Sequence, residues 1–233
     1  MRFHSFYTDN LPKQIVEDHK KCSERVGLEV HYHEYPTFDT FDEAFFAHGE
    51  FETKMMEQED DDVVCFIDID CLPTSEEVLY SAYSWAKAND SFVGNAQNIG
   101  HMPHKNYLYA APGLILVSKK GWEKLGKPSF RAYHIPLENG GELLIDTAQE
   151  ITNRANQIGM DYRLIYPTGF DSHRSTLAHY GYMGKGTLYP GSWHYFRISD
   201  FIDKEELPEL WNRRVNDIIS GREIKPNYSS KFY

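Results

Sequence analysis

The sequence is poor in cysteine and contains no long apolar run. Its three cysteines, Cys22, Cys65 and Cys71, give an odd number without paired spacing, which argues against a disulfide framework and favours a reducing compartment. No apolar run approaches the roughly 18 residues of a membrane-spanning helix, and the first ten residues lack the pattern of a signal peptide. We therefore expect a cytoplasmic protein without a membrane span.

Positive charge is also scarce. The 24 lysine and arginine residues stand against 35 acidic ones, and the formal net charge is −11. Such a surface repels nucleic-acid phosphates and anionic lipids, so duplex DNA is an unfavoured partner that would need a local basic patch. An anionic substrate that arrives with a divalent cation is compatible with this charge.

The remaining composition is that of an ordinary globular protein. Hydrophobic residues make up 41% and charged residues 25% of the 233 positions, which excludes disorder along the whole chain. The length suits one domain with small additions, and the sequence shows no internal repeat and no long linker.

Segments with the period of a strand alternate with segments that have the period of a helix. We expect strands at 2–7, 29–35, 63–67, 91–96, 107–118 and 163–166, and helices at 11–26, 41–58, 120–125 and 142–157, with one more helix capped by Thr74. This order predicts an α/β fold with a mixed, mostly parallel sheet flanked by helices. We expect one catalytic domain over residues 1–200 and a helical C-terminal extension over 201–233.

The motif with the clearest chemistry is Asp68-Ile69-Asp70. It follows the continuous apolar run Val63–Ile67, which is typical of a strand buried on both faces, and ligands bind at the carboxyl end of such strands in open α/β sheets. If the motif is extended, its two carboxylates point the same way and can bind one hard cation, Mg²⁺ or Mn²⁺. The alternative is a pair of acids in a surface turn.

The segment Val63–Pro73 resembles the DxD region of the GT-A glycosyltransferases, and the order of elements is similar over roughly residues 1–196. The resemblance implies a GT-A, Rossmann-like fold and a metal-dependent transfer of a sugar from a nucleoside-diphosphate sugar to a hydroxyl acceptor. It assigns Asp70 to the metal, Asp68 to the metal or the ribose and sugar, and Ile69 to the donor site. A late histidine completes the metal site in many members, and His194 takes that place here, with His179 and His173 as competitors.

The resemblance also implies further residues on both sides of the reaction. Pro112 and Gly113 are similar to a turn on the acceptor side of the family's site, and Trp193 lies next to the late histidine. Residues at the donor side are Tyr7 and Thr8 after the first strand, Tyr35 after the second, and Lys54 in the helix that precedes the DxD strand.

A further match is Leu144-Ile145-Asp146, which resembles the x-E-D element of the family. In inverting members its aspartate is the general base that deprotonates the acceptor hydroxyl, and Asp146 takes this role by resemblance. The family's glutamate is replaced by Ile145, so Glu138 or Glu142 is an alternative base. A retaining enzyme would not need this base.

Two other functions fit parts of the sequence. A haloacid-dehalogenase-like phosphatase also has D-x-D after an apolar strand, with the first aspartate as nucleophile, but it expects a threonine where Leu72 stands and a motif nearer the N-terminus. A binding module for nucleotide sugars that has lost its base is the second alternative, kept open by the missing glutamate at position 145.

Overall fold

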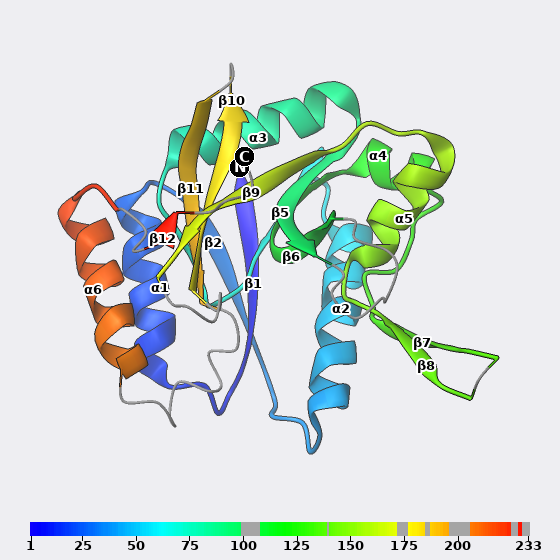
Figure 1. The fold of residues 1–233 in the computed structure, drawn as a ribbon, viewed down its shortest axis with the longest axis horizontal. Helices are drawn as coiled ribbons and strands as arrows, with labels where there is room; N and C mark the ends of the chain where they lie inside the picture. The colour runs from blue at the N-terminus through cyan, green and yellow to red at the C-terminus, as the bar shows by residue number, and fades with distance from the viewer. Residues whose placement is uncertain are drawn as a thin grey trace.

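The structure is a computed structural model that describes residues 1–98, 108–138, 140–171, 177–184, 187–195, 206–224 and 228–229. One large sheet runs through the molecule, and helices cover both of its faces (Figure 1). The strands are β1 (Arg2–Thr8), β2 (Glu29–Tyr35), β3 (Val63–Ile67), β4 (Cys71–Pro73), β5 (Phe92–Asn98), β6 (Leu108–Ser118), β7 (Tyr133–Pro136), β8 (Glu142–Ile145), β9 (Arg163–Phe170), β10 (Leu177–Gly184), β11 (Thr187–Tyr195) and β12 (Tyr228–Ser229). The helices are α1 (Lys13–Arg25), α2 (Phe41–Gln58), α3 (Glu76–Asn89), α4 (Lys119–Lys124), α5 (Gln149–Ile158) and α6 (Glu206–Ser220).

The strand order of the large sheet is β2-β1-β3-β6-β5-β9-β10-β11-β4, with β12 beside β9. Strands β2, β1, β3, β5 and β9 run in one direction, and β6 runs antiparallel between β3 and β5. The expected single-domain α/β fold with a mixed, mostly parallel sheet is confirmed. Parallel strands end at the same edge of a sheet, so the carboxyl ends of β1, β2 and β3 share one edge.

Strand β3 divides the core into two halves because its side chains alternate between the two faces of the sheet. Val63, Cys65 and Ile67 pack with the apolar face of α3. Val64 and Phe66 pack with side chains from α2, α4 and α5 on the other face. All five residues are almost fully buried, as the continuous apolar run predicts. A rigid strand therefore leads directly to the DxD motif.

One expected helix is wrong over its first part. Residues Glu142–Ile145 form β8, which pairs with β7 in a hairpin that projects from the body (Figure 1). Ala148 follows with a positive φ of 61° and is fully buried, and its N–H donates to the carbonyl of Phe130 at 2.8 Å. This tertiary contact breaks the helical pattern, so α5 begins only at Gln149.

Two smaller expectations also need correction. Ser75, and not Thr74, caps α3, because the Ser75 side chain accepts from the N–H of Val78 at 3.4 Å. After Pro167, strand β9 continues to Phe170, and the hairpin β10–β11 follows it. Glycine and aromatic residues hid the strand period in this segment.

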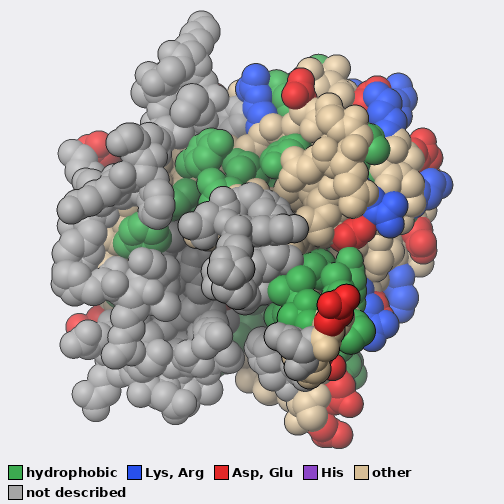
Figure 2. Space-filling model, turned by 45° about the vertical axis from the view of Figure 1, so that its right-hand side comes forward, with side chains coloured by type: hydrophobic (Ala, Val, Ile, Leu, Met, Phe, Trp, Pro, Cys, Tyr) green, Lys and Arg blue, Asp and Glu red, His purple; other side chains and the backbone are tan. Residues whose placement is uncertain are grey.

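The hairpin β7–β8 exposes apolar side chains. Tyr133, Ile135 and Leu137 are 38%, 37% and 43% exposed. Figure 2 turns that side of the molecule forward and shows hydrophobic side chains gathered on its lower right. Among the described residues, no helix combines the length and the apolar character needed to span a membrane.

A buried ion cluster fastens α6 to the sheet. The Arg214 guanidinium donates to both carboxylate oxygens of Asp171 at 2.7 Å, and His179 Nε2 lies 2.9 Å from Asp171 Oδ2. Burial acts to raise the pKa of Asp171, but the hydrogen bonds from His179 and Arg214 hold it well below its usual range. Helix α6 lies in the expected C-terminal extension and packs on α1; a boundary after residue 200 stays a prediction.

The substitution Arg214→Met should strongly destabilise the fold, because it leaves the Asp171 carboxylate buried without its main partner. The expected loss is about 3–5 kcal/mol, which corresponds to a fall in Tm of roughly 10 °C for a chain of this size. The double variant Asp171→Asn/Arg214→Met should regain part of the loss. Thermal unfolding of the three proteins checks this, and a double variant less stable than Arg214→Met would contradict it.

Because His4 and His19 are buried, we expect the free energy of unfolding to fall in acid. Burial lowers the pKa of His4 and His19 from 6.5 to about 4. The unfolded chain therefore binds more protons between these pH values, and the free energy of unfolding falls as the pH drops from 6.5 towards 4, by up to roughly 3 kcal/mol for each histidine. Urea unfolding across this range measures the slope. The variant His19→Gln should flatten it, and an unchanged slope would refute the assignment.

Candidate active site

Asp68, Ile69 and Asp70 form the turn that leaves the carboxyl end of β3. The N–H of Cys71 donates to the Asp68 carbonyl at 2.9 Å, so the motif is a turn and not the extended segment that we expected. The N–H of Asp68 donates to the carbonyl of Gly113 at 3.1 Å. The Asp68 side chain is 24% exposed, whereas Asp70 is 9% exposed and Ile69 is buried in the core.

Pro112 and Gly113 adjoin this turn because β6 is the antiparallel neighbour of β3. The expected interruption of β6 is instead a bulge: the strand is continuous, but its register with β5 shifts between Gly94 and Asn95. A bulge re-aims the strand locally, and here it lies where the Gly113 carbonyl meets Asp68. The two residues expected on the acceptor side are therefore next to the DxD motif.

His48 of α2 lies between two carboxylates. Its Nε2 is 3.3 Å from Asp68 Oδ1 and 3.6 Å from Glu52 Oε1. Burial acts to lower the pKa of His48, but the neighbouring Glu52 and Asp68 raise it well above its ordinary value. Burial raises the pKa of Glu52, which His48 partly offsets. One nitrogen of His48 therefore contacts both the buried Glu52 and the first carboxylate of the motif.

Asp146 directly follows β8 and is held by two donors. The hydroxyl of buried Tyr109, on β6, donates to its Oδ2, and the N–H of Thr147 donates to its Oδ1 at 2.8 Å. Its own N–H donates to Gln149 Oε1 at 2.9 Å. Burial raises the pKa of Tyr109 well above its ordinary value, and the charges of Asp146 and, less strongly, Asp68 add to this rise. Tyr109 therefore helps to orient the Asp146 carboxylate.

The late histidines fall in different places. Strand β11 pairs with β4, which places the backbone of His194 in register with Cys71, the residue after the motif. The side chains of Trp193 and His194 lie outside the described residues, as does His173. His179 contacts Asp171 in the buried ion cluster.

Residues expected at the donor side lie at the ends of β1 and β2. Thr8 is the register partner of Tyr35, and Tyr7 precedes it in the same parallel pair. The Tyr35 ring stacks on Phe51 with centroids 5.0 Å apart. Lys54 is exposed on α2, and its Nζ lies 5.4 Å from the centroid of the same Phe51 ring. The structure thus brings Tyr7, Thr8 and Tyr35 to the edge of the sheet where β3 also ends.

Asp68 and Asp70 offer the donors that a hard cation needs. Carboxylate oxygens are the ligands that Mg²⁺ and Mn²⁺ prefer, and both side chains belong to one turn at the end of a rigid strand. Within the described residues, no three His, Cys, Asp or Glu side chains are arranged to hold a metal ion. A divalent cation bound by this pair stays a prediction.

The chain is similar to solved structures in its fold, at low sequence identity. No family model and no curated protein matches the chain. The solved structure of the galactosyltransferase LgtC with donor and acceptor sugar analogues matches at 13% identity with a TM-score of 0.51, over 97% of this chain and 98% of that one. An active-site mutant of LgtC matches at 12% identity with a TM-score of 0.50, over the same shares. A Drosophila β1,4-galactosyltransferase 7 mutant with manganese, UDP-Gal and xylobiose matches at 14% identity with a TM-score of 0.45, over 96% and 81%.

These matches cover almost the whole chain. The chain has the GT-A glycosyltransferase fold. The resemblance seen around Val63–Pro73 is thereby confirmed for the fold.

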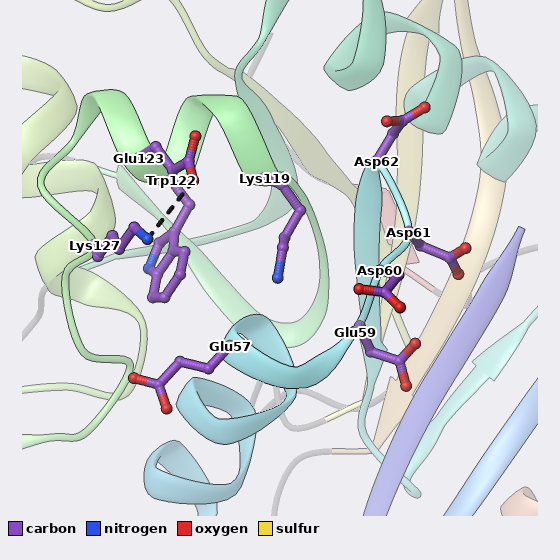
Figure 3. A pocket seen from close by; sticks show the side chains of 9 residues that line it. All are labelled: Glu57, Glu59, Asp60, Asp61, Asp62, Lys119, Trp122, Glu123 and Lys127. Atoms are coloured by element: carbon purple, nitrogen blue, oxygen red, sulfur yellow. Dashed lines mark ion pairs between the residues drawn. The ribbon is translucent and has the colours of Figure 1, made fainter.

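One pocket of this GT-A fold lies at the opposite end of β3. Its lining includes the acidic segment that precedes Val63 and residues at and after α4 (Figure 3): Glu57, Glu59, Asp60, Asp61, Asp62, Lys119, Trp122, Glu123 and Lys127. Lys119 donates to the carbonyl of Met56, and Lys127 pairs with Glu123 at 3.6 Å. The pocket is separated from the DxD turn by the length of β3.

Three residues near the site were missed from the sequence. His48 and Glu52 are four residues apart on α2, which places them on the same helix face, and this spacing was an available signal. Tyr109 is one tyrosine among 16, and nothing in its local sequence distinguishes it. Only the tertiary arrangement shows that its hydroxyl contacts Asp146.

Proposed function

We propose that the chain is a metal-dependent glycosyltransferase that moves a hexose or pentose from a nucleoside-diphosphate sugar to a hydroxyl acceptor. The observation that carries the proposal is the Asp68–Asp70 turn at the carboxyl end of β3 in a GT-A fold, beside Gly113 of β6. The Tyr109 hydroxyl donates to Asp146. The charges of Asp146 and, less strongly, Asp68 raise the pKa of Tyr109, which supports a location of Asp146 near the turn.

Asp70 and Asp68 would hold Mn²⁺ or Mg²⁺ through their carboxylates, with His194 as the third protein ligand. A bound divalent cation neutralises the charge that develops on a leaving nucleoside diphosphate. Tyr7, Thr8, Tyr35 and Lys54 would contact the donor nucleotide, and Ile69 would place its backbone beside the sugar. Pro112, Gly113 and Trp193 would line the sugar and acceptor side.

Asp146 is suited to accept the proton of the acceptor hydroxyl. Its two hydrogen-bond donors fix the orientation of the carboxylate, and each of its oxygens has a second lone pair for an acceptor. In an inverting reaction the hydroxyl oxygen bonds to the anomeric carbon as its proton moves to Asp146, and the nucleoside diphosphate leaves with the electron pair of the broken bond. Asp146 adjoins the start of α5, whose dipole favours a negative charge.

The reaction is proposed for a cytoplasmic, reducing compartment. Cys22, Cys65 and Cys71 support this, because all three are buried and, among the described residues, none forms a disulfide. Burial raises the pKa of Cys22 to about 12, so its thiol stays protonated and unreactive.

The wild-type chain should bind one nucleoside diphosphate only when Mn²⁺ or Mg²⁺ is present. A ligand at 100 times its Kd stabilises a protein by about 2.7 kcal/mol, which is a rise in Tm of roughly 5–10 °C for this chain length. The variant Asp70→Asn keeps the shape of the side chain and should lose the metal-dependent rise. Thermal unfolding with and without EDTA measures both, and a full rise in Asp70→Asn would contradict the metal assignment.

The substitution Asp146→Asn should stop transfer and spare donor binding. General-base catalysis contributes about 10²–10⁴-fold to a rate, so kcat should fall by that factor while the Kd of the nucleotide stays unchanged. Glu142→Gln is the matched control, because Glu142 is exposed on β8, where its carboxylate lies 3.4 Å from His134 Nδ1. A loss of kcat in Glu142→Gln with full activity in Asp146→Asn would move the base to Glu142.

A further inference from the structure

We propose that His48 and Glu52 of α2 are positioning residues for the DxD motif: Glu52 holds His48, and His48 holds the Asp68 carboxylate in the orientation that donor binding requires. The inference rests on the proposed function. It adds two residues that lie outside the DxD motif. Both act through Asp68 and are not expected to touch the donor.

The first observation is the burial of Glu52. The residue is fully buried, and neither carboxylate oxygen has a hydrogen-bond partner among the described residues. Such a group is costly in a protein interior unless an opposite charge compensates it. Its ion-pair contact within the described residues is His48 Nε2, 3.6 Å from Glu52 Oε1.

The second observation is the single nitrogen that links both carboxylates. His48 Nε2 is also 3.3 Å from Asp68 Oδ1, so Glu52, His48 and Asp68 form a chain from the interior to the site. Asp68 is the exposed end, with 24% of its side chain accessible, whereas Glu52 retains 1%. A contact from His48 limits rotation of the Asp68 carboxylate, and groups of this kind orient the ligands of metal sites.

The third observation is that helix α2, which carries His48 and Glu52, is fixed against strand β3. Helix α2 begins with a capping box between Thr40 and Glu43, and Met56, one turn after Glu52, is fully buried in the core against β3. The helix and the strand that carry the three residues are therefore fixed relative to each other. A buried position that served packing alone would hold an apolar residue. Position 52 instead holds a glutamate that contacts His48.

The test measures the Kd of the nucleoside diphosphate that binds best, in the presence of Mn²⁺, by calorimetry. His48→Ala and Glu52→Gln should each weaken binding by about 10-fold, and His48→Gln, which keeps an N–H donor, should recover part of the loss. Glu57→Gln is the matched control, since it makes the same substitution at an exposed position of α2, and its Kd should equal that of the wild type.

A double-mutant cycle separates positioning from packing. In the Asp68→Asn background, His48→Ala should add little further loss, because its effect passes through Asp68. An equal loss in both backgrounds, or variants with a lower Tm and an unchanged Kd, would overturn the inference. Glu52→Gln has the volume of the native residue and keeps the test decisive if His48→Ala does not fold.

Nucleotide binding by the wild type separates failure of the proposed function from failure of the positioning role. If it binds no nucleoside diphosphate with Mn²⁺, the proposed function fails, and the positioning role fails with it. If the wild type binds and His48→Ala and Glu52→Gln bind equally well, the glycosyltransferase proposal stands and the positioning role alone is overturned.

Discussion

The arrangement of the site depends on the burial of β3. Because every residue from Val63 to Ile67 is covered on both faces, the strand has one register and one direction, and slippage by one residue would move apolar side chains into the wrong half of the core. The end of β3 therefore sets the place of Asp68, and Gly113 of the antiparallel neighbour β6 binds the Asp68 backbone. The other residues of the site are placed relative to that end.

The sequence predicted most of the elements that build this edge. Continuous or alternating apolar patterns located β1, β2, β3 and α2 within a residue or two, and the D-x-D motif directly follows β3 as expected. The prediction failed where tertiary contacts override local pattern: Ala148 adopts a positive φ because its N–H meets the Phe130 carbonyl, and this contact turns the first part of an expected helix into β8.

The partners of the site were harder to predict than its carboxylates. Asp68 and Asp146 stand in recognisable motifs, whereas Tyr109 and His48 act through contacts between residues 37 and 20 positions apart in the sequence. No periodicity or spacing rule reports such contacts. His179 was one candidate for the late histidine of the metal site. In the structure it contacts Asp171, which also binds Arg214.

Two buried charge clusters have different consequences for this acidic chain. In the cluster of Asp171, His179 and Arg214, the carboxylate is satisfied on both oxygens, so the cluster joins α6 to β9 and β10 as a closed unit. In the chain of Glu52, His48 and Asp68, the Glu52 carboxylate at the inner end has no hydrogen-bond partner in the described part of the protein, and Asp68 at the outer end reaches solvent. Hydrogen bonding is complete in the first cluster and incomplete in the second, and an incomplete buried network is costly. Such a cost is typical of functional sites, and it supports the proposed positioning role of His48 and Glu52.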